Sequence, residues 1–308
     1  MVERTAAARR AGPELRIACP LCGVTDERER FVLEDHRVVA CRRCGLEYIN
    51  PQPTVEAVEA RYDGSYFESA DPLSWGYQNY AAMRPSLEPG FRKKLSVMRR
   101  FAPPPGALLD VGCAYGFFLE LARRGGWTIS GIDLSAHAVE RARQQLGSAD
   151  LRVGQLSAAQ FPAGSFDAIT CWDVNEHTRD PLVFLRETAR LLKPGGRLFL
   201  TVPNVGTTHA RILGRYWEGF AKIREHLFYF TPATADRALE LAGFERLYRQ
   251  SSGPSVTLNF LAGKLARYST GVSRAAQSIL EAVRLRDAVV SFPFIDLLVI
   301  ARHAPQVT

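Results

Sequence analysis

The chain has 308 residues, of which 46% are hydrophobic, and this is enough for one sizeable core and a small additional module. Its net charge of +7 permits contact with nucleic acid, anionic lipid or phosphorylated molecules but requires none of them. The composition excludes a disordered chain, and no stretch offers the roughly 20 uninterrupted apolar residues of a membrane-spanning helix. The first residues hold no apolar run before a cleavage site, so we expect a cytoplasmic protein whose clustered cysteines bind metal.

Two CxxCG segments follow a loose leader that we place at residues 1–15. They contain Cys19 with Cys22 and Cys41 with Cys44, separated by 18 residues, and the stretch 28–40 between them alternates enough to form a hairpin. This spacing is typical of a four-thiolate zinc ribbon. Because all four positions are cysteine, no coordination position is left for a catalytic water, and we predict a structural ion. A redox dithiol is the alternative.

A linker region connects the ribbon to the rest of the chain. Pro51 to Pro53 ends the ribbon, a helical pattern runs over 55–67, and a looser stretch leads to Tyr80. The aromatic residues Tyr62, Tyr66 and Phe67 either cover the mouth of a ligand site or pack as an ordinary connector. A basic helix over 91–101 precedes the first core strand. We therefore divide the chain into a leader and ribbon (1–50), a helical linker or lid (51–102) and a main domain (103–308).

A strand, a tight turn and a helix are predicted around residues 108–116, LLDVGCAYG. Two apolar residues lead into Asp110, and Gly112, Ala114 and Gly116 form the turn before a helix over 117–122. Glycines after a buried strand let a ligand approach the backbone closely, and both dinucleotide and adenosyl ligands use this geometry.

Carboxylates at the ends of two strands discriminate between these ligands. Asp110 ends the first strand, and Asp133, 23 residues later, ends a second apolar strand over 128–132. A carboxylate repels a pyrophosphate but attracts the ammonium and sulfonium groups of S-adenosylmethionine, and Asp133 is placed to accept both ribose hydroxyls. We therefore predict an S-adenosylmethionine pocket. The alternative is a sheet without a nucleotide, whose glycines only turn the chain.

Strands and helices alternate in the rest of the main domain. Further strands are expected over 151–153, 166–171, 197–202, 244–248 and 295–302, with helices over 136–146 and 181–192. This alternation predicts a parallel sheet covered on both faces, with the ligand at the carboxyl ends of the strands. Asp110, Asp133, Gln155 and Asp173 all follow such strands, so we expect them to converge on one crevice. The remaining cysteines, Cys113 and Cys171, are expected to line the core or the pocket.

In this order, the motifs resemble those of the class I S-adenosylmethionine-dependent methyltransferases. The matching segments are Asp110-Val-Gly-Cys-Ala-Tyr-Gly, Gly131-Ile-Asp133, Phe166-Asp-Ala-Ile-Thr, Glu176-His177 and Leu192-Lys-Pro-Gly-Gly. The cysteine pairs and Glu225-His226-Leu-Phe-Tyr-Phe-Thr-Pro are similar to the subgroup with an amino-terminal zinc ribbon, which includes sugar and natural-product methyltransferases. The resemblance covers roughly residues 17–250. It implies an α/β fold with a Rossmann-like, seven-stranded sheet, helices on both faces and a small zinc ribbon before it.

The resemblance also implies roles for individual residues. Asp110, Gly112, Ala114 and Gly116 would line the methionine moiety, Asp133 would hold the ribose, and Gln155 and Leu156 would border the adenine. We also expect Leu134, Trp172 and Asp173 to contact the cofactor. The chain departs from the family twice. Ala114 replaces a usual glycine, and Gln155-Leu156-Ser157 replaces a segment that often holds an acid. Recognition of the adenine amino group would then fall to the Gln155 side-chain oxygen or to a backbone carbonyl.

Two histidines are the candidate catalytic residues. Methyl transfer mainly requires alignment of a nucleophile, and a base is needed only when the nucleophile arrives protonated. The segment 204–230 is longer than a simple connection and is expected to form a lid or a substrate wall. Within it, His226 either takes a proton from a hydroxyl or steadies the lid through a backbone carbonyl. His177, beside Glu176, is expected to position the acceptor or to line the pocket.

An amphipathic insertion over 252–290 lies near the carboxyl terminus. Apolar residues at helical spacing are Leu258, Leu261, Ala262, Leu265 and Ala266, then Val272, Ala275, Ala276, Ile279, Leu280 and Val283. Basic residues fall mostly outside these stripes. Such a hairpin either rests on anionic lipid and receives a lipid-linked substrate, or buries its stripes against its own domain or a second copy in a homodimer.

The predicted function is methyl transfer from S-adenosylmethionine to a small-molecule acceptor, at a hydroxyl of a sugar, glycan or natural-product intermediate. One alternative is an rRNA base methyltransferase. The ribbon carries both signs of charge without dense interleaving of basic and aromatic residues, so nucleic acid is not the expected partner. The other alternative is a non-catalytic, zinc-containing adaptor that retains the cofactor pocket.

Overall fold

The computed structural model describes residues 14–69, 76–253, 255–265, 269–292 and 294–304, and most of the expected leader lies outside these ranges. Its centre is a seven-stranded sheet with the order β12-β15-β10-β9-β6-β7-β8. The strands are β6 (Gly106–Val111), β7 (Trp127–Asp133), β8 (Asp150–Val153), β9 (Phe166–Trp172), β10 (Leu192–Pro203), β12 (Phe244–Ser252) and β15 (Asp296–His303). Only β15 runs antiparallel to its neighbours. The predicted α/β fold with seven strands is confirmed.

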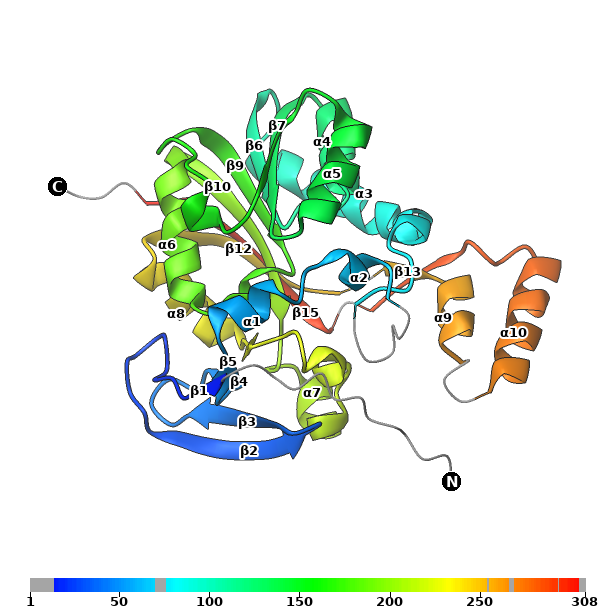
Figure 1. Cartoon of the computed structure of the whole chain (residues 1–308), viewed down its shortest axis with the longest axis horizontal. Helices are drawn as coiled ribbons and strands as arrows, with labels where there is room; N and C mark the ends of the chain where they lie inside the picture. Colours follow the sequence, from blue (N-terminus) through cyan, green and yellow to red (C-terminus); the bar gives the residue numbers. More distant parts are fainter. Residues whose placement is uncertain (1–13, 70–75, 254, 266–268, 293, 305–308) are drawn as a thin grey trace.

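Helices cover both faces of this sheet (Figure 1). They are α3 (Arg84–Phe101), α4 (Phe117–Arg124) and α5 (Ala136–Leu146) on one face, and α6 (Pro181–Leu191) and α8 (Pro232–Leu241) on the other. One core cluster gathers Met98, Phe118 and Val139 from the first three helices, and a second gathers Leu185 and Ala238 from the other two. Successive side chains of a strand point to opposite faces, so β6 contributes to both clusters. The carboxyl ends of the parallel strands are thereby left as the edge where a ligand binds.

The amino-terminal ribbon is completed by a strand from the main domain. Its sheet has the order β11-β4-β3-β2, formed by β2 (Glu27–Leu33), β3 (His36–Cys41), β4 (Glu47–Ile49) and β11 (Phe228–Tyr229). The expected hairpin is β2–β3. The linker predicted at Pro51 to Pro53 is wrong, because β5 (Gln52–Pro53) pairs with β1 (Glu14–Leu15) and Gln52 is fully buried. The proline-rich sequence suggested an exposed connector, but the ribbon packs onto the main domain at this point.

Most of the expected lid, residues 204–230, packs beneath the ribbon rather than over a ligand. It forms α7 (Thr208–Leu213) and short 3₁₀ turns, and Trp217, Phe220 and Ile223 share a buried cluster with Val38 and Ile49 of the ribbon. Its two ends lie at the carboxyl edge of the sheet, where Val205 N bonds Phe230 O and Leu227 N bonds Glu176 O. The apolar aromatic residues of this segment therefore serve mainly as the joint between ribbon and sheet.

The continuous helix predicted over 55–67 is interrupted. The structure has α1 (Val55–Glu59) and α2 (Gly64–Phe67), with Asp63 between them accepting a hydrogen bond from Ser65 N at 2.9 Å. An aspartate before a glycine favours a new helix start over continuation, which explains the break. Farther on, a 3₁₀ turn, Ala81–Met83, leads into α3, which begins seven residues before the expected start.

The carboxyl-terminal insertion forms a helical hairpin that projects from the sheet (Figure 1). It consists of α9 (Leu258–Lys264) and α10 (Thr270–Ala282), flanked by the paired strands β13 (Ser255–Thr257) and β14 (Val289–Ser291). Val272, Ile279 and Val283 remain 57%, 62% and 55% exposed, so this stripe is not buried against its own domain. Ala266 of the first stripe lies outside the described residues. None of the helices in the described part of the chain is long and apolar enough to cross a membrane.

The joint between ribbon and sheet gives a stability prediction. Trp217 is 1% exposed, whereas the neighbouring Tyr216 is 73% exposed. We expect Trp217→Ala to lower the free energy of unfolding by about 3–5 kcal/mol, because it leaves a cavity that the surroundings fill only in part. Tyr216→Ala is the matched control and should change it by less than about 0.5 kcal/mol. Denaturant titration measures both, and equal effects of the two variants would contradict the packing described here.

Candidate active site

In the glycine-rich loop after β6, every second residue from 112 to 116 has a left-handed backbone conformation. The φ angles are +75° at Gly112, +46° at Ala114 and +77° at Gly116. A Cβ at Gly112 would lie 2.5 Å from a methyl carbon of Val174. A larger residue at this position would therefore meet both this steric clash and the strain of a positive φ. Ala114 tolerates the strained conformation at roughly 1–2 kcal/mol, which explains how the chain accommodates alanine where the family has glycine.

Asp133 at the end of β7 fixes this loop. Its carboxylate accepts hydrogen bonds from the backbone N–H groups of Ala114 and Ser135, each at 2.9 Å. Burial raises the pKa of Asp133, while these N–H groups oppose the shift. A carboxylate has about four lone-pair sites, so Asp133 retains capacity for hydroxyl groups such as those of a ribose. Leu134 follows it, half-buried.

Asp110 is the most deeply buried acid of the loop, at 2% exposure. The Thr170 hydroxyl donates to it at 2.5 Å. Burial raises the pKa of Asp110 to about 7, against the opposing effects of Thr170 and Lys94. A cationic ligand beside this carboxylate would compensate for the lost hydration and favour the ionised form. Two buried acids with an exposed glycine backbone between them are therefore a donor set suited to S-adenosylmethionine.

Gln155 and Leu156 begin the 3₁₀ turn that follows β8. Leu156 is buried in the core, and the Gln155 amide donates to Glu59 Oε1 at 2.5 Å. This bond leaves the Gln155 oxygen free to accept. Sequence reasoning missed Glu59, because 96 residues separate it from Gln155 and nothing in the local pattern links α1 to this turn.

Asp173 follows β9 in a left-handed conformation with φ of +58°. Its backbone N–H and its carboxylate both bond the Thr201 hydroxyl, at 2.9 and 2.7 Å. Lys94 of α3 lies 4.0 Å from the Asp173 carboxylate and 4.5 Å above the ring of Trp172. Lys94 was not predicted as a site residue either, because the sequence does not distinguish it from the other basic residues of its helix.

The two candidate catalytic histidines, 49 positions apart in the sequence, lie edge to face with ring centroids 4.7 Å apart. A backbone bond from Leu227 N to Glu176 O, at 2.7 Å, brings their segments together. Burial lowers the pKa of His177 to about 4 and the pKa of His226 well below its usual value. Both imidazoles are therefore neutral at pH 7. Glu176, 1% exposed, has its pKa raised well above the usual range by burial.

Aromatic residues of the segment after α1 close over these groups. The Tyr66 hydroxyl donates to Glu225 at 2.9 Å, and Tyr62 Oη lies 3.1 Å from His177 Nδ1. Phe67 stacks on Tyr115 of the glycine-rich loop with centroids 5.1 Å apart. Tyr66 and Phe67 are buried and share a cluster with Tyr115 of the loop. Glu225 and Tyr66 were not predicted as site residues.

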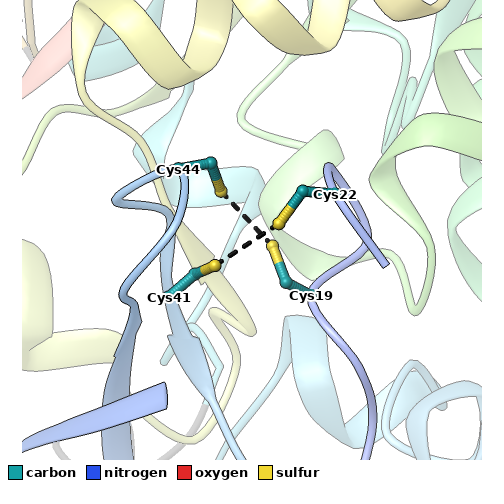
Figure 2. A group of neighbouring side chains, drawn as sticks. All are labelled: Cys19, Cys22, Cys41 and Cys44. Atoms are coloured by element: carbon teal, nitrogen blue, oxygen red, sulfur yellow. Dashed lines mark hydrogen bonds between the residues drawn. The ribbon is translucent and has the colours of Figure 1, made fainter. Parts of the chain in front are cut away.

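The four ribbon cysteines form a compact cluster in which the sulfur atoms point toward one another (Figure 2). Cys19 Sγ lies 3.4 Å from Cys44 Sγ, and Cys22 Sγ lies 3.4 Å from Cys41 Sγ. All four sulfur atoms lie within 4.8 Å of one another. Sulfur atoms around a tetrahedral ion with bonds of about 2.3 Å would lie about 3.8 Å apart. The donor set and its size therefore match a four-thiolate site, and Cys113 and Cys171 are buried elsewhere in the core.

The fold and the cofactor loop define a class I, S-adenosylmethionine-dependent methyltransferase. A family model described as a methyltransferase domain matches residues 86–248, just over half of the chain, and the chain belongs to this methyltransferase family.

Similar proteins support this assignment. A ubiquinone biosynthesis O-methyltransferase of Xanthomonas campestris pv. campestris (strain B100) is 43% identical over 114 residues, covering 35% of this chain and 47% of the relative. A protein of the same name from Xanthomonas axonopodis pv. citri is 42% identical over 113 residues, with the same coverage. The chain thus spans about half the length of the curated relatives it matches. A solved Bacillus halodurans C-125 protein, provisionally described as a methyltransferase, is 18% identical with a TM-score of 0.53 and supports the fold alone; the match covers 70% of this chain and all of that one.

The burial of Asp110 gives a prediction about cofactor affinity. At pH 8, Asp110→Asn should weaken S-adenosylmethionine binding about 10- to 100-fold, because a charge-assisted contact is lost. Wild-type affinity should fall as the pH drops below about 7, where Asp110 takes up a proton, and the variant should lack this dependence. Calorimetric titration across pH measures both effects.

A stability measurement separates this effect from unfolding. The folded chain keeps a proton on Asp110 between pH 3.8 and about 7, where the unfolded chain has released it, so ionisation over this range destabilises the unliganded fold. Asparagine does not ionise, and Asp110→Asn should be no less stable than wild type at pH 8. Asp167→Asn, at the opposite end of β9 beside Lys193, is the matched control. Unchanged affinity of Asp110→Asn would refute the assigned role.

Proposed function

We propose that this methyltransferase transfers the methyl group of S-adenosylmethionine to a hydroxyl of a small molecule. One observation carries the proposal: His226 Nδ1 is buried and neutral and has no hydrogen-bond partner within the described chain. It lies beside His177 at the edge where the cofactor loop ends. An unprotonated nitrogen in this place is suited to accept the proton that a hydroxyl must lose when its oxygen is methylated.

Each residue of the site has a part in this proposal. When bound, S-adenosylmethionine supplies a methyl group activated by a sulfonium. Asp110 and Asp133 hold its charged and hydroxylated parts, and His226 takes the acceptor proton. His177 packs against His226 and orients it, while the tyrosines over the loop exclude water, which strengthens electrostatic interactions inside the site.

The acceptor we propose carries a hydroxyl on a sugar, glycan or natural-product intermediate. The relatives are named as O-methyltransferases of ubiquinone biosynthesis, which supports oxygen as the methylated atom and adds an intermediate of that kind to the acceptors to be tested. The experiment is methyl transfer from isotope-labelled donor to phenols, sugar nucleotides and ribosomal RNA in parallel. Label on a small-molecule oxygen supports the proposal, whereas label on RNA alone would replace it with the rRNA alternative.

We also propose that the cysteine cluster binds a structural zinc ion. Gly23 and Gly45, with φ of +69° and +79°, let each cysteine pair turn tightly. Four thiolates would fill the coordination sphere, and the ion would hold the ribbon and, through β4, the strand β11.

The role of His226 predicts a large loss of turnover in His226→Ala. We expect kcat to fall about 10²- to 10⁴-fold, since this is the usual contribution of a positioned base, with S-adenosylmethionine affinity unchanged. His209→Ala is the control, because His209 bonds the exposed Glu218 away from the loop. Steady-state kinetics with the acceptor found above measures the effect, and full turnover by His226→Ala would leave this histidine a structural role only.

The proposed zinc predicts the behaviour of ribbon variants. Cys41→Ser should abolish the thiolate-to-metal absorption of the Co²⁺-substituted protein and lower stability by more than about 4 kcal/mol, in the range typical of a lost metal site. Cys171→Ala is the control for metal content, since its sulfur lies in the core of the main domain. A wild-type chain that shows no thiolate-to-metal absorption would contradict the proposal.

A further inference from the structure

We propose that Glu176, His177 and His226 form a second metal site, which binds a divalent transition-metal ion such as Zn²⁺ through one carboxylate and two imidazoles. One ligand atom from each residue lies within 4.8 Å of the other two. The site is distinct from the cysteine cluster and has a different donor set. Ion binding here does not depend on which acceptor is methylated.

The hydrogen bonds of His177 determine which of its nitrogens is free. His177 Nδ1 lies 3.2 Å from the backbone oxygen of Glu225. Tyr62 Oη lies 3.1 Å from the same nitrogen. With the hydrogen on Nδ1, donated to the Glu225 carbonyl oxygen, Nε2 carries a lone pair. Nε2 lies 4.0 Å from Glu176 Oε1. A metal-bound histidine almost always donates its other N–H to a carbonyl or carboxylate in this way.

His226 presents a second lone pair to the same space. Its ring bonds the backbone of Gly219, and its Nδ1 has no partner among the described residues. The residue is only 9% exposed, so water does not readily replace the missing partner. A buried acceptor without a donor costs free energy. Each imidazole is therefore bonded to a backbone group through one ring nitrogen, and its other nitrogen has a lone pair for a ligand.

Glu176 supplies the third ligand, an oxygen of its carboxyl group. It is 1% exposed, and its Oε2 has no partner in the described structure. A proton on this carboxyl would not give His177 Nε2 a hydrogen-bond donor, because the distance of 4.0 Å between Nε2 and Glu176 Oε1 is too long for a hydrogen bond. Two imidazoles and one carboxylate are a common ligand set for zinc and other first-row metals. An ion would satisfy all three acceptors at once.

Charged groups of both signs surround the cluster. The Asp173 and Asp296 carboxyl groups and the Lys222 ammonium all act on Glu176, and Lys222 also acts on both histidines. Three protein ligands also leave a coordination position open. If the acceptor is a hydroxyl, as proposed above, it would bind there and release its proton to solvent more readily. His226 Nδ1 would then hold the ion, so the metal site and the base role of His226 exclude each other.

Metal counting on the full chain tests the site independently of turnover. We expect wild type, dialysed against Zn²⁺ and then against metal-free buffer, to retain two ions per chain by mass spectrometry. His226→Ala and Glu176→Gln should each retain one, with the thiolate-to-metal absorption of their Co²⁺ forms unchanged. His209→Ala is the control and should retain two. Thermal unfolding and S-adenosylmethionine affinity verify that each variant is folded.

Two results would overturn the inference. One is a wild-type chain that retains a single, thiolate-bound ion under these conditions. The other is retention of two ions by both His226→Ala and Glu176→Gln. If His226→Ala loses turnover while wild type holds only the thiolate-bound ion, the base role stands and the second site fails. If the second ion is lost in the variants but no acceptor is methylated at oxygen, the site stands and the proposed function fails.

Discussion

The arrangement of the active site depends on one backbone hydrogen bond, from Leu227 N to Glu176 O at 2.7 Å. It joins the end of β9 to the segment that carries His226, and the next two residues pair with β4 of the ribbon. The distance between the two histidines is therefore set by main-chain pairing on both sides rather than by flexible side chains. The ribbon, through β4, therefore takes part in positioning the two histidines.

Buried acids recur along the carboxyl edge of the sheet. Asp110, Asp133 and Glu176 are each at most 9% exposed, and burial raises the pKa of all three. Burial removes the hydration of these carboxyl groups, which is unfavourable. The hydrogen bonds that Asp110 accepts from Thr170 and Asp133 from backbone N–H groups compensate for only part of this loss. A positively charged ligand at this edge, such as the sulfonium of S-adenosylmethionine, recovers more of it, and this links ligand binding to the stability of the fold.

The sequence contained enough local signal for the sheet, the glycine-rich loop and the cysteine pairs. Apolar runs marked the strands, and fixed spacing marked Cys19 to Cys44. It did not show that Glu59 meets Gln155, that Tyr66 meets Glu225 or that β11 joins the ribbon, because these contacts connect segments 96 to more than 150 residues apart. The prolines at 51 and 53 suggested a linker, because nothing in the sequence around them indicates that β5 pairs with β1.

The segment between the ribbon and α3 touches the cleft at two places. Glu59 holds the turn at Gln155, and Tyr66 holds Glu225 beside the histidines. These two bonds join α1 and α2 to turns that lie 96 and 159 residues further along the chain. Residues that precede the sheet in the sequence therefore help to fix the loops along its carboxyl edge.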